Sequence, residues 1–218
     1  VKVEGDYEFL GNQVRMAGLP PLANLAGHVL FDEDGARSRD LAVDVMGGRA
    51  HLALSSANGT VRVNANGNAS VASLKSEVDW PLMNRVSGTA DWDLVAQARS
   101  GTTSWTLTSN LRGTAIDLPA PIGKAAGDAV PLRVDVRETA GKAGEDAVTV
   151  DYRNLLRVLA HRNVGTDGAR VDRALVAAGR LVAAGLEPRL ACTIAVVEPL
   201  SDDEEVLAPL RDLVSLAF

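Results

Sequence analysis

Residues 41–54 of the chain read Leu-Ala-Val-Asp-Val-Met-Gly-Gly-Arg-Ala-His-Leu-Ala-Leu. In the first half, three apolar residues alternate with smaller or polar ones, which is the period-2 pattern of a β-strand with one buried face. The glycine pair at 47–48 interrupts the pattern, and the residues from His51 to Leu54 start a second strand. Two short strands joined by a glycine turn predict an antiparallel hairpin.

The same unit recurs on both sides of this stretch. Strands are expected over residues 27–31, 41–45, 51–54, 61–64, 91–95, 103–109, 132–137 and 147–152, with turns at 32–35, 56–59, 66–67 and 100–101. Successive turns lie roughly 10 residues apart, which is typical of hairpins laid side by side. The sequence therefore predicts a mainly β chain, a meandering, curved antiparallel sheet of repeated hairpins that is either an open groove or sandwich-like.

The C-terminal third is less uniform. Residues 1–138 form the repeated hairpin sheet in this prediction, and residues 139–218 continue the β segment. Alanine and leucine between Val171 and Val182 favour a helix by propensity, whereas the valines and Gly179 oppose it. A short C-terminal helix is expected after the capping box at 201–204, because apolar residues then recur at helical spacing.

Composition excludes several classes of partner. The chain has 218 residues, 46% of them hydrophobic, and a net charge of -6. It lacks the clustered Lys and Arg that nucleic acids or anionic headgroups require, so no nucleic acid partner is expected. No run of about 18 apolar residues is present, so no membrane span is expected. Because the first residue is Val1 and no leader precedes it, the chain is expected to be a piece of a longer protein.

No pattern in the chain predicts catalysis. Motifs for nucleophilic serine, phosphate loops, dinucleotides or zinc are missing, so we expect no enzyme activity, no catalytic residue, no metal and no cofactor. The lone Cys192 fits a small buried residue. The acidic turn at 32–35 lacks the further ligands of a calcium loop. Trp92 and Trp105 lie on neighbouring expected strands, where they either contact each other or line an apolar groove.

Several short motifs resemble, in order, the YhdP branch of the AsmA-like proteins, which are large envelope proteins of Gram-negative bacteria. The most distinctive is the loop formed by Leu118, Pro119, Pro121, Ile122, Gly123 and Lys124, preceded by Ser109-Asn-Leu-Arg-Gly113. Other matching segments are residues 25–31, 47–48, 83–92, 130–132, Tyr152 and 171–174. After Gly185-Leu186 the chain lacks the tryptophan of the family's ending.

The resemblance implies a periplasmic segment of an inner-membrane-anchored protein, with the anchor in other parts of the parent protein. It implies a curved sheet whose apolar face shields or conducts phospholipid acyl chains between the two membranes, which serves outer-membrane lipid homeostasis. The partners expected on this basis are acyl chains and envelope proteins. The candidate groove residues are Val29, Phe31, Leu41, Val43, Val45, Leu52, Leu54, Val61, Val63, Trp105, Leu107, Leu132, Val134 and Val136.

Two alternatives remain open. The candidate residues form a closed sandwich core if the sheet folds on itself, because an alternating strand usually faces a core. In the second alternative, the chain is a structural or protein-binding β module of the envelope that uses its exposed strand edges.

Overall fold

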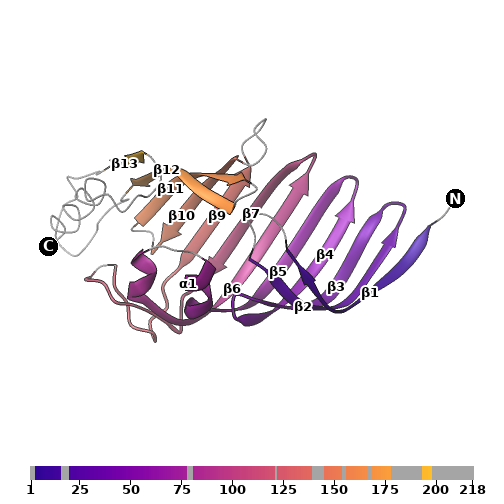
Figure 1. Cartoon of the computed structure of the whole chain (residues 1–218), viewed down its shortest axis with the longest axis horizontal. Helices are drawn as coiled ribbons and strands as arrows, with labels where there is room; N and C mark the ends of the chain where they lie inside the picture. Colours follow the sequence, from indigo (N-terminus) through magenta and orange to yellow (C-terminus); the bar gives the residue numbers. More distant parts are fainter. Residues whose placement is uncertain are drawn as a thin grey trace.

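The computed structural model describes residues 3–15, 20–77, 81–120, 122–138, 145–153, 156–165, 168–177 and 193–197. These residues form one long antiparallel sheet that is not closed on itself, which confirms the predicted mainly β meander (Figure 1). Its strands are β1 (Glu4–Val14), β2 (Leu22–Asp32), β3 (Gly35–Val45), β4 (Gly48–Ala57), β5 (Thr60–Ser70), β6 (Val86–Arg99), β7 (Thr102–Ser109), β8 (Thr114–Ile116), β9 (Leu132–Glu138), β10 (Glu145–Tyr152), β11 (Leu156–Gly165), β12 (Gly168–Ala177) and β13 (Thr193–Val197).

The strand order follows the sequence. It runs from β1 to β7, then from β9 to β13, while the short β8 pairs with the start of β6. Each hairpin therefore lies beside the next. Three of the connecting turns have positive φ at both central residues, as type I′ turns require: Met46-Gly47, Asn58-Gly59 and Ser100-Gly101.

The turn expected at Asn66-Gly67 is wrong. Both residues lie inside β5, which pairs with β6 without interruption from Thr60 to Ser70. Position 67 needs a glycine because side chains of the two neighbouring strands approach it closely. A Cβ atom there would lie 2.7 Å from the Cβ of Ala50 and 2.9 Å from Cζ2 of Trp92. Glycine inside a strand marks such contacts as well as turns.

Bulges bend the first strands of the sheet. Register shifts interrupt the pairs β1–β2, β2–β3 and β3–β4, whereas pairing is regular from β4 to β10. A bulge increases local twist and bends its strand. The bent ends carry Val14 and Leu22 onto a buried cluster that contains Leu25, Val43 and Trp92.

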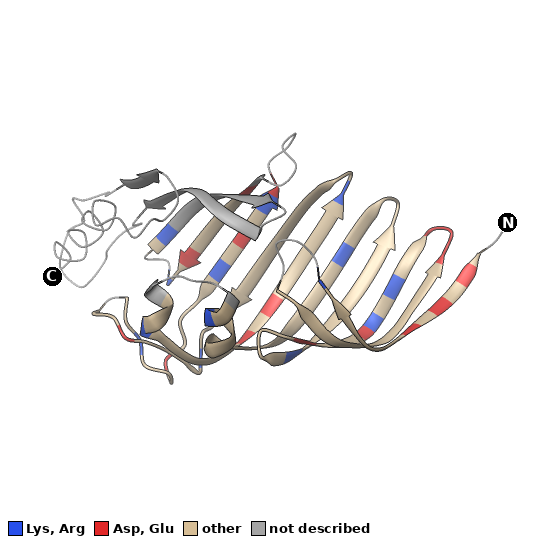
Figure 2. Cartoon of the chain, viewed as in Figure 1, with Lys and Arg blue, Asp and Glu red and all other residues tan. Residues whose placement is uncertain are grey.

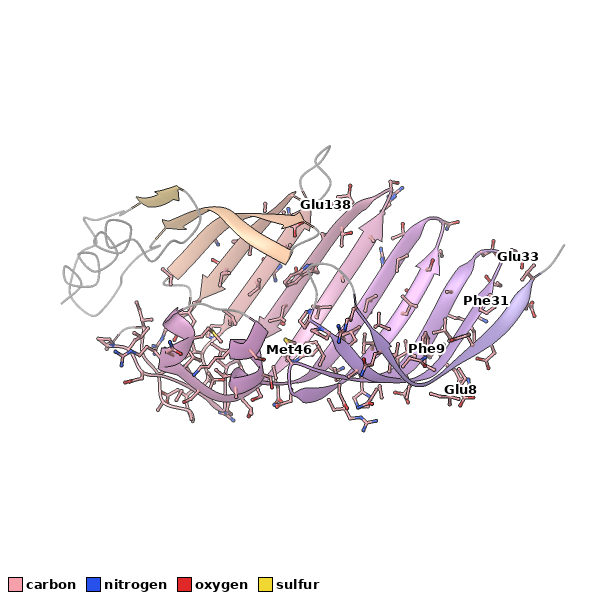
Figure 3. All side chains as sticks on the ribbon, viewed as in Figure 1. Glu8, Phe9, Phe31, Glu33, Met46 and Glu138 are labelled. Carbon is pink, nitrogen blue, oxygen red and sulfur yellow. The ribbon has the colours of Figure 1, made fainter. Side chains whose placement is uncertain are left out.

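Helices are few in the described part of the chain. α1 (Val71–Glu77) and the 3-10 helix η1 (Pro81–Arg85) lie between β5 and β6. The sequence did not predict α1. Leu74 of α1 packs against the buried cluster, and so does Met46, which is labelled in Figure 3. The expected C-terminal helix lies outside the described residues. The helical propensity of residues 171–177 is overridden, because they belong to β12 and pair with β11.

Candidate functional site: the apolar inner face

Register brings all fourteen candidate residues to one face of the sheet, here called the inner face. Two rows of this face run across six strands in unbroken register from β4 to β10. The first row contains Leu54, Val63, Ala96, Trp105, Val136 and Val148, and the second contains Leu52, Ala65, Leu94, Leu107, Val134 and Val150. Five interstrand spacings of about 4.8 Å make each row roughly 24 Å long.

Burial varies across the inner face. Four of the candidates are buried: Leu41, Val43, Val45 and Val136. Eight are half-buried: Val29, Leu52, Leu54, Val63, Trp105, Leu107, Leu132 and Val134. Phe31 and Val61 are exposed, at 42% and 36%. Leu41, Val43 and Val45 belong to a packed end near the bent strands, whereas Val136 is a buried position on β9. Elsewhere the apolar side chains are partly in contact with solvent, and this is the open part of the inner face.

The packed end is built around Trp92. Only 7% of this residue is exposed, and its ring lies over Gly67 of the neighbouring strand. Its Nε1 atom is buried and has no hydrogen-bond partner among the described residues. A buried donor without a partner has a cost of about 1–3 kcal/mol, so the packing around the ring must offset it.

The opposite, outer face is polar. Asp135 accepts hydrogen bonds from Arg133 Nε at 2.6 Å and from the Thr106 hydroxyl at 2.5 Å. Arg133 thereby holds the pKa of the Asp135 carboxyl below its ordinary value. Asp151 pairs with Arg157 at 2.6 Å on the adjacent strand. Figure 2 shows Lys, Arg, Asp and Glu as coloured bands on many of the strands. One face of the sheet is thus solvated and the other is apolar.

The loop from Leu118 to Lys124 has a structural role in this fold. Lys124 is only 7% exposed, and its Nζ donates to the carbonyl oxygens of Leu111, Thr114 and Ala125. Burial lowers the pKa of the Lys124 ammonium, although nearby Asp128 opposes the shift. The ammonium thus joins the start of β8 to the loop that follows it.

The same loop is also tied to β10. The Tyr152 hydroxyl donates to the carbonyl oxygen of Ile122 at 2.6 Å, and Arg153 lies 3.4 Å from that of Gly123. Gly123 has no space for a side chain, because a Cβ would lie 1.7 Å from the carbonyl oxygen of Leu118. Pro121 lies outside the described residues. The loop therefore links the start of β8, through Lys124, to the last residue of β10, through Tyr152.

Residues 1–215 of the chain match the family described as YhdP protein. The chain belongs to the YhdP family. The match covers nearly the whole sequence, so the resemblance seen in the short motifs is confirmed. The inner face and the Lys124 loop are therefore features of a YhdP-family sheet.

A second similarity is local. A stretch of 44 residues is 50% identical to the denitrification regulatory protein NirQ of Pseudomonas aeruginosa, covering 20% of this chain. The chain matches 17% of that protein's length. No solved structure matches the chain.

Some inner-face residues of this YhdP-family chain were not expected from sequence. Ala96 was missed because the strand at 91–95 was expected to end at Val95, although β6 continues to Arg99. Leu94 lies within the expected strand but was not assigned to the groove. Tyr7 and Phe9 were missed because no strand was assigned to residues 4–14, where acidic and aromatic residues alternate.

The expected contact between Trp92 and Trp105 is wrong. Register places Trp105 opposite Ala96, whereas Trp92 lies opposite Gly67, so the row of Leu94 and Leu107 lies between the two indole rings. The ring contact among the described residues joins Tyr7 and Phe9, with centroids 4.8 Å apart.

The described part of the chain offers little support for a metal site, a membrane-spanning helix or a polar binding pocket. No group of three or more His, Cys, Asp or Glu residues that could hold a metal ion occurs there. None of its helices has the length and apolarity needed to cross a membrane. A hollow of about 350 Å³ lies beside the middle of β6 and the end of β7, lined by Asp91, Asp93, Thr108, Ser109, Asn110, Ala129, Val130 and Pro131. Asn68 and Ser109 already bond to Asp91 there, so its polar groups serve the fold.

Proposed function

We propose that this chain is a non-enzymatic periplasmic segment of an envelope protein anchored in the inner membrane, and that its inner face shields or conducts phospholipid acyl chains. The observation that supports the proposal is the pair of unbroken apolar rows, roughly 24 Å long and half-buried except at Ala65 and Val136. The hydrocarbon core of a bilayer is about 30 Å thick, so one leaflet's acyl chain of about 15 Å fits along a row.

The energetics favour acyl chains over headgroups. Each methylene that leaves water for the inner face contributes about 0.8 kcal/mol. The two rows present Val, Leu, Ala and Trp side chains, which bind any saturated segment in a similar way at each strand. An acyl chain can therefore shift from strand to strand along a row with little change in free energy.

The test is retention of lipid by the purified chain, measured by native mass spectrometry and by lipid analysis after organic extraction. We expect the wild-type chain to retain phospholipid, and Val63→Asp to lose it because a carboxylate then interrupts the first row. Val61→Asp is a second inner-face variant at a site that is already 36% exposed, so its fold is expected to survive.

Val95→Asp is the matched control. Val95 lies on the outer face of β6, beside the partner of Val63, and is 57% exposed. The same substitution there is expected to leave the retained lipid unchanged. A folded wild-type chain that retains no phospholipid, or equal loss in all three variants, would contradict the proposal. Val43 is unsuited to this test because it is only 1% exposed, so Val43→Asp would unfold the packed end.

A structural or protein-binding module is the second candidate function. The observation in its favour is the buried cluster around Val43 and Trp92, where inner-face residues pack in a core and not along an open groove.

A further inference from the structure

The two apolar rows of the inner face are bordered by residues of different character on their two sides. Beyond the first row lies a polar margin, which contains Ser56, Val61, Ala98, Thr103, Glu138 and Asp146. Beyond the second row lies a closed margin, which contains Ala50, Gly67, Trp92, Ser109, Leu132 and Tyr152. The two rows thus form an apolar strip with unlike sides.

The closed margin is covered by other parts of the fold. Ala50 is 0% exposed and Trp92 is 7% exposed. α1 lies over this side, because Leu74 packs against the buried cluster that contains Trp92. The turn that follows β3 is covered as well, since a Cβ on Gly47 would lie 2.1 Å from the hydroxyl oxygen of Ser73. A polar headgroup therefore has little room beside the second row.

The polar margin is open to solvent. Val61 is 36% exposed, and Thr103 is exposed. The turns beside this margin are uncovered, because a Cβ on Gly59 or Gly101 would meet no heavy atom within 4 Å. The carboxylate of Glu138, labelled in Figure 3, accepts a hydrogen bond from the backbone N–H of Thr103 at 3.0 Å. Hydrogen-bonding groups and solvent therefore meet the apolar strip beside the first row.

The width of the strip suits two alkyl chains. Alternate residues of a strand are about 6.7 Å apart, which is therefore the separation of the two rows. The nearest carbon atoms of alkyl chains in van der Waals contact are about 4 Å apart. One chain thus fits on each row, and a third chain would lie on a margin. Both rows run across the same strands from β4 to β10, so the two chains can lie parallel.

We infer that the open part of the inner face holds two acyl chains side by side, one on each row, and that both belong to one diacyl lipid whose headgroup lies at the polar margin. This inference rests on the proposed function and adds a substrate class to it, namely lipids with two chains. The two chains of one lipid are tethered, so the second chain meets its row at a high effective concentration once the first is bound. A single-chain lipid lacks that advantage.

The experiment counts bound acyl chains by native mass spectrometry of the whole protein. The protein is saturated with dipalmitoyl phosphatidylethanolamine or with the lyso form, which has one palmitoyl chain and the same headgroup. We expect the lyso form to bind in twice the number of the diacyl form, because each row takes one chain in both cases. Equal numbers of the two lipids would overturn the inference. This count needs no variant, so it stands even where a substitution disturbs the fold.

Two substitutions in the middle of the rows test the assignment of one chain to each row. Ala96→Asp interrupts the first row and Leu107→Asp interrupts the second. Each leaves apolar stretches of at most about 10 Å, shorter than an acyl chain of about 15 Å. Either variant should halve the bound lyso form and weaken binding of the diacyl form about 100-fold, since one chain loses its row.

The outer-face variant Val95→Asp is the matched control and should bind both lipids as the wild type does. Circular dichroism checks that each variant is folded. A folded Ala96→Asp or Leu107→Asp variant that binds the diacyl form with wild-type affinity would overturn the inference.

The position of the headgroup is tested with a diacyl lipid that carries a nitroxide on its headgroup. The amide NMR signals of Ala98 and Thr103 should broaden more than those of Gly67 and Ser109. Stronger broadening at Gly67 and Ser109 would overturn the orientation. A folded wild-type protein that binds neither lipid would contradict the proposed function itself, whereas binding of both lipids in equal numbers would contradict the inference alone.

Discussion

At the scale of single residues, the tightest constraint lies where Trp92 crosses Gly67. The ring takes the space that a side chain on Gly67 would need, and Ala50 limits the space from the next strand. Small residues on β4 and β5 thereby let one large aromatic residue on β6 close the packed end.

Gly67→Ala is expected to destabilise the chain by about 1–3 kcal/mol, because the added methyl group overpacks the contact with Trp92 and Ala50. Urea unfolding followed by tryptophan fluorescence measures the change. Gly127→Ala is the control, since a Cβ there has no heavy atom within 4 Å. Equal stability of both variants would show that the packed end relaxes around the methyl group.

Tyr152 makes stability depend on pH. Burial raises the pKa of its phenol above the ordinary 10.0, and the positive charge of Arg153 offsets the shift only in part. A group whose pKa is raised on folding contributes stability that is full below its unfolded pKa and is lost as pH rises through its folded pKa. The wild-type chain should therefore lose stability above about pH 10.

Tyr152→Phe should remove that part of the pH dependence. At neutral pH the variant should lose about 1 kcal/mol, because the hydrogen bond to the Ile122 carbonyl is absent. Unfolding free energies of both proteins between pH 8 and about pH 11 measure the difference. Parallel curves over the whole range would exclude Tyr152 as the titrating group.

At the scale of elements, the turn between β3 and β4 supports α1. A Cβ on Gly47 would lie 2.1 Å from the Ser73 hydroxyl oxygen of α1, and Gly47 has a φ of 72°. Gly101 has a similar φ of 78° in the turn after β6, but a Cβ there meets nothing within 4 Å.

Comparing Gly47→Ala with Gly101→Ala therefore separates backbone strain from the contact with α1. Both variants should lose about 1 kcal/mol from positive φ, and Gly47→Ala should also displace α1. Hydrogen exchange at residues 71–77 should accelerate only in Gly47→Ala. Unchanged exchange there would mean that α1 is held by Leu74 alone.

The strands were predictable from sequence more readily than their ends and bends. Alternation with glycine turns located β3, β4, β7 and β9, since each buries one face. The same rule misplaced a turn at Gly67, because a glycine that accommodates a neighbour looks like a glycine that turns the chain. The bulges of β1 to β3 left no periodic signal, and α1 is too short for helical periodicity to show.

The candidate site was predictable in part. Every candidate groove residue lies on the inner face, because alternation fixes the face of each residue within a strand. Alternation does not say how deeply a residue is buried, so Val43 in the packed end and Val61 in the open part looked equivalent. That difference depends on the bent ends of β1 and β2, which cover only one end of the strands.

At the scale of the whole molecule, each strand contacts mainly the strands beside it. Such a quasi-one-dimensional sheet gains its stability from nearest-neighbour pairs, and in the described part of the chain the outermost strands, β1 and β13, each pair with one strand only. Hydrogen exchange should therefore be slowest in β4, β5 and β6 and faster toward β1 and β13. Uniform protection that vanishes in one step at a single urea concentration would instead indicate all-or-none unfolding.

The sequential strand order also bears on how the chain acquires its structure. Several hairpins close turns of a few residues, and the longer steps, from β5 to β6 and from β7 to β9, span residues 71–85 and 110–131. Low contact order lowers the entropic barrier to folding. A chain emerging from its N-terminus can thus lay each new strand on the previous one, so that assembly keeps pace with delivery and the growing edge advances from β1 toward β13.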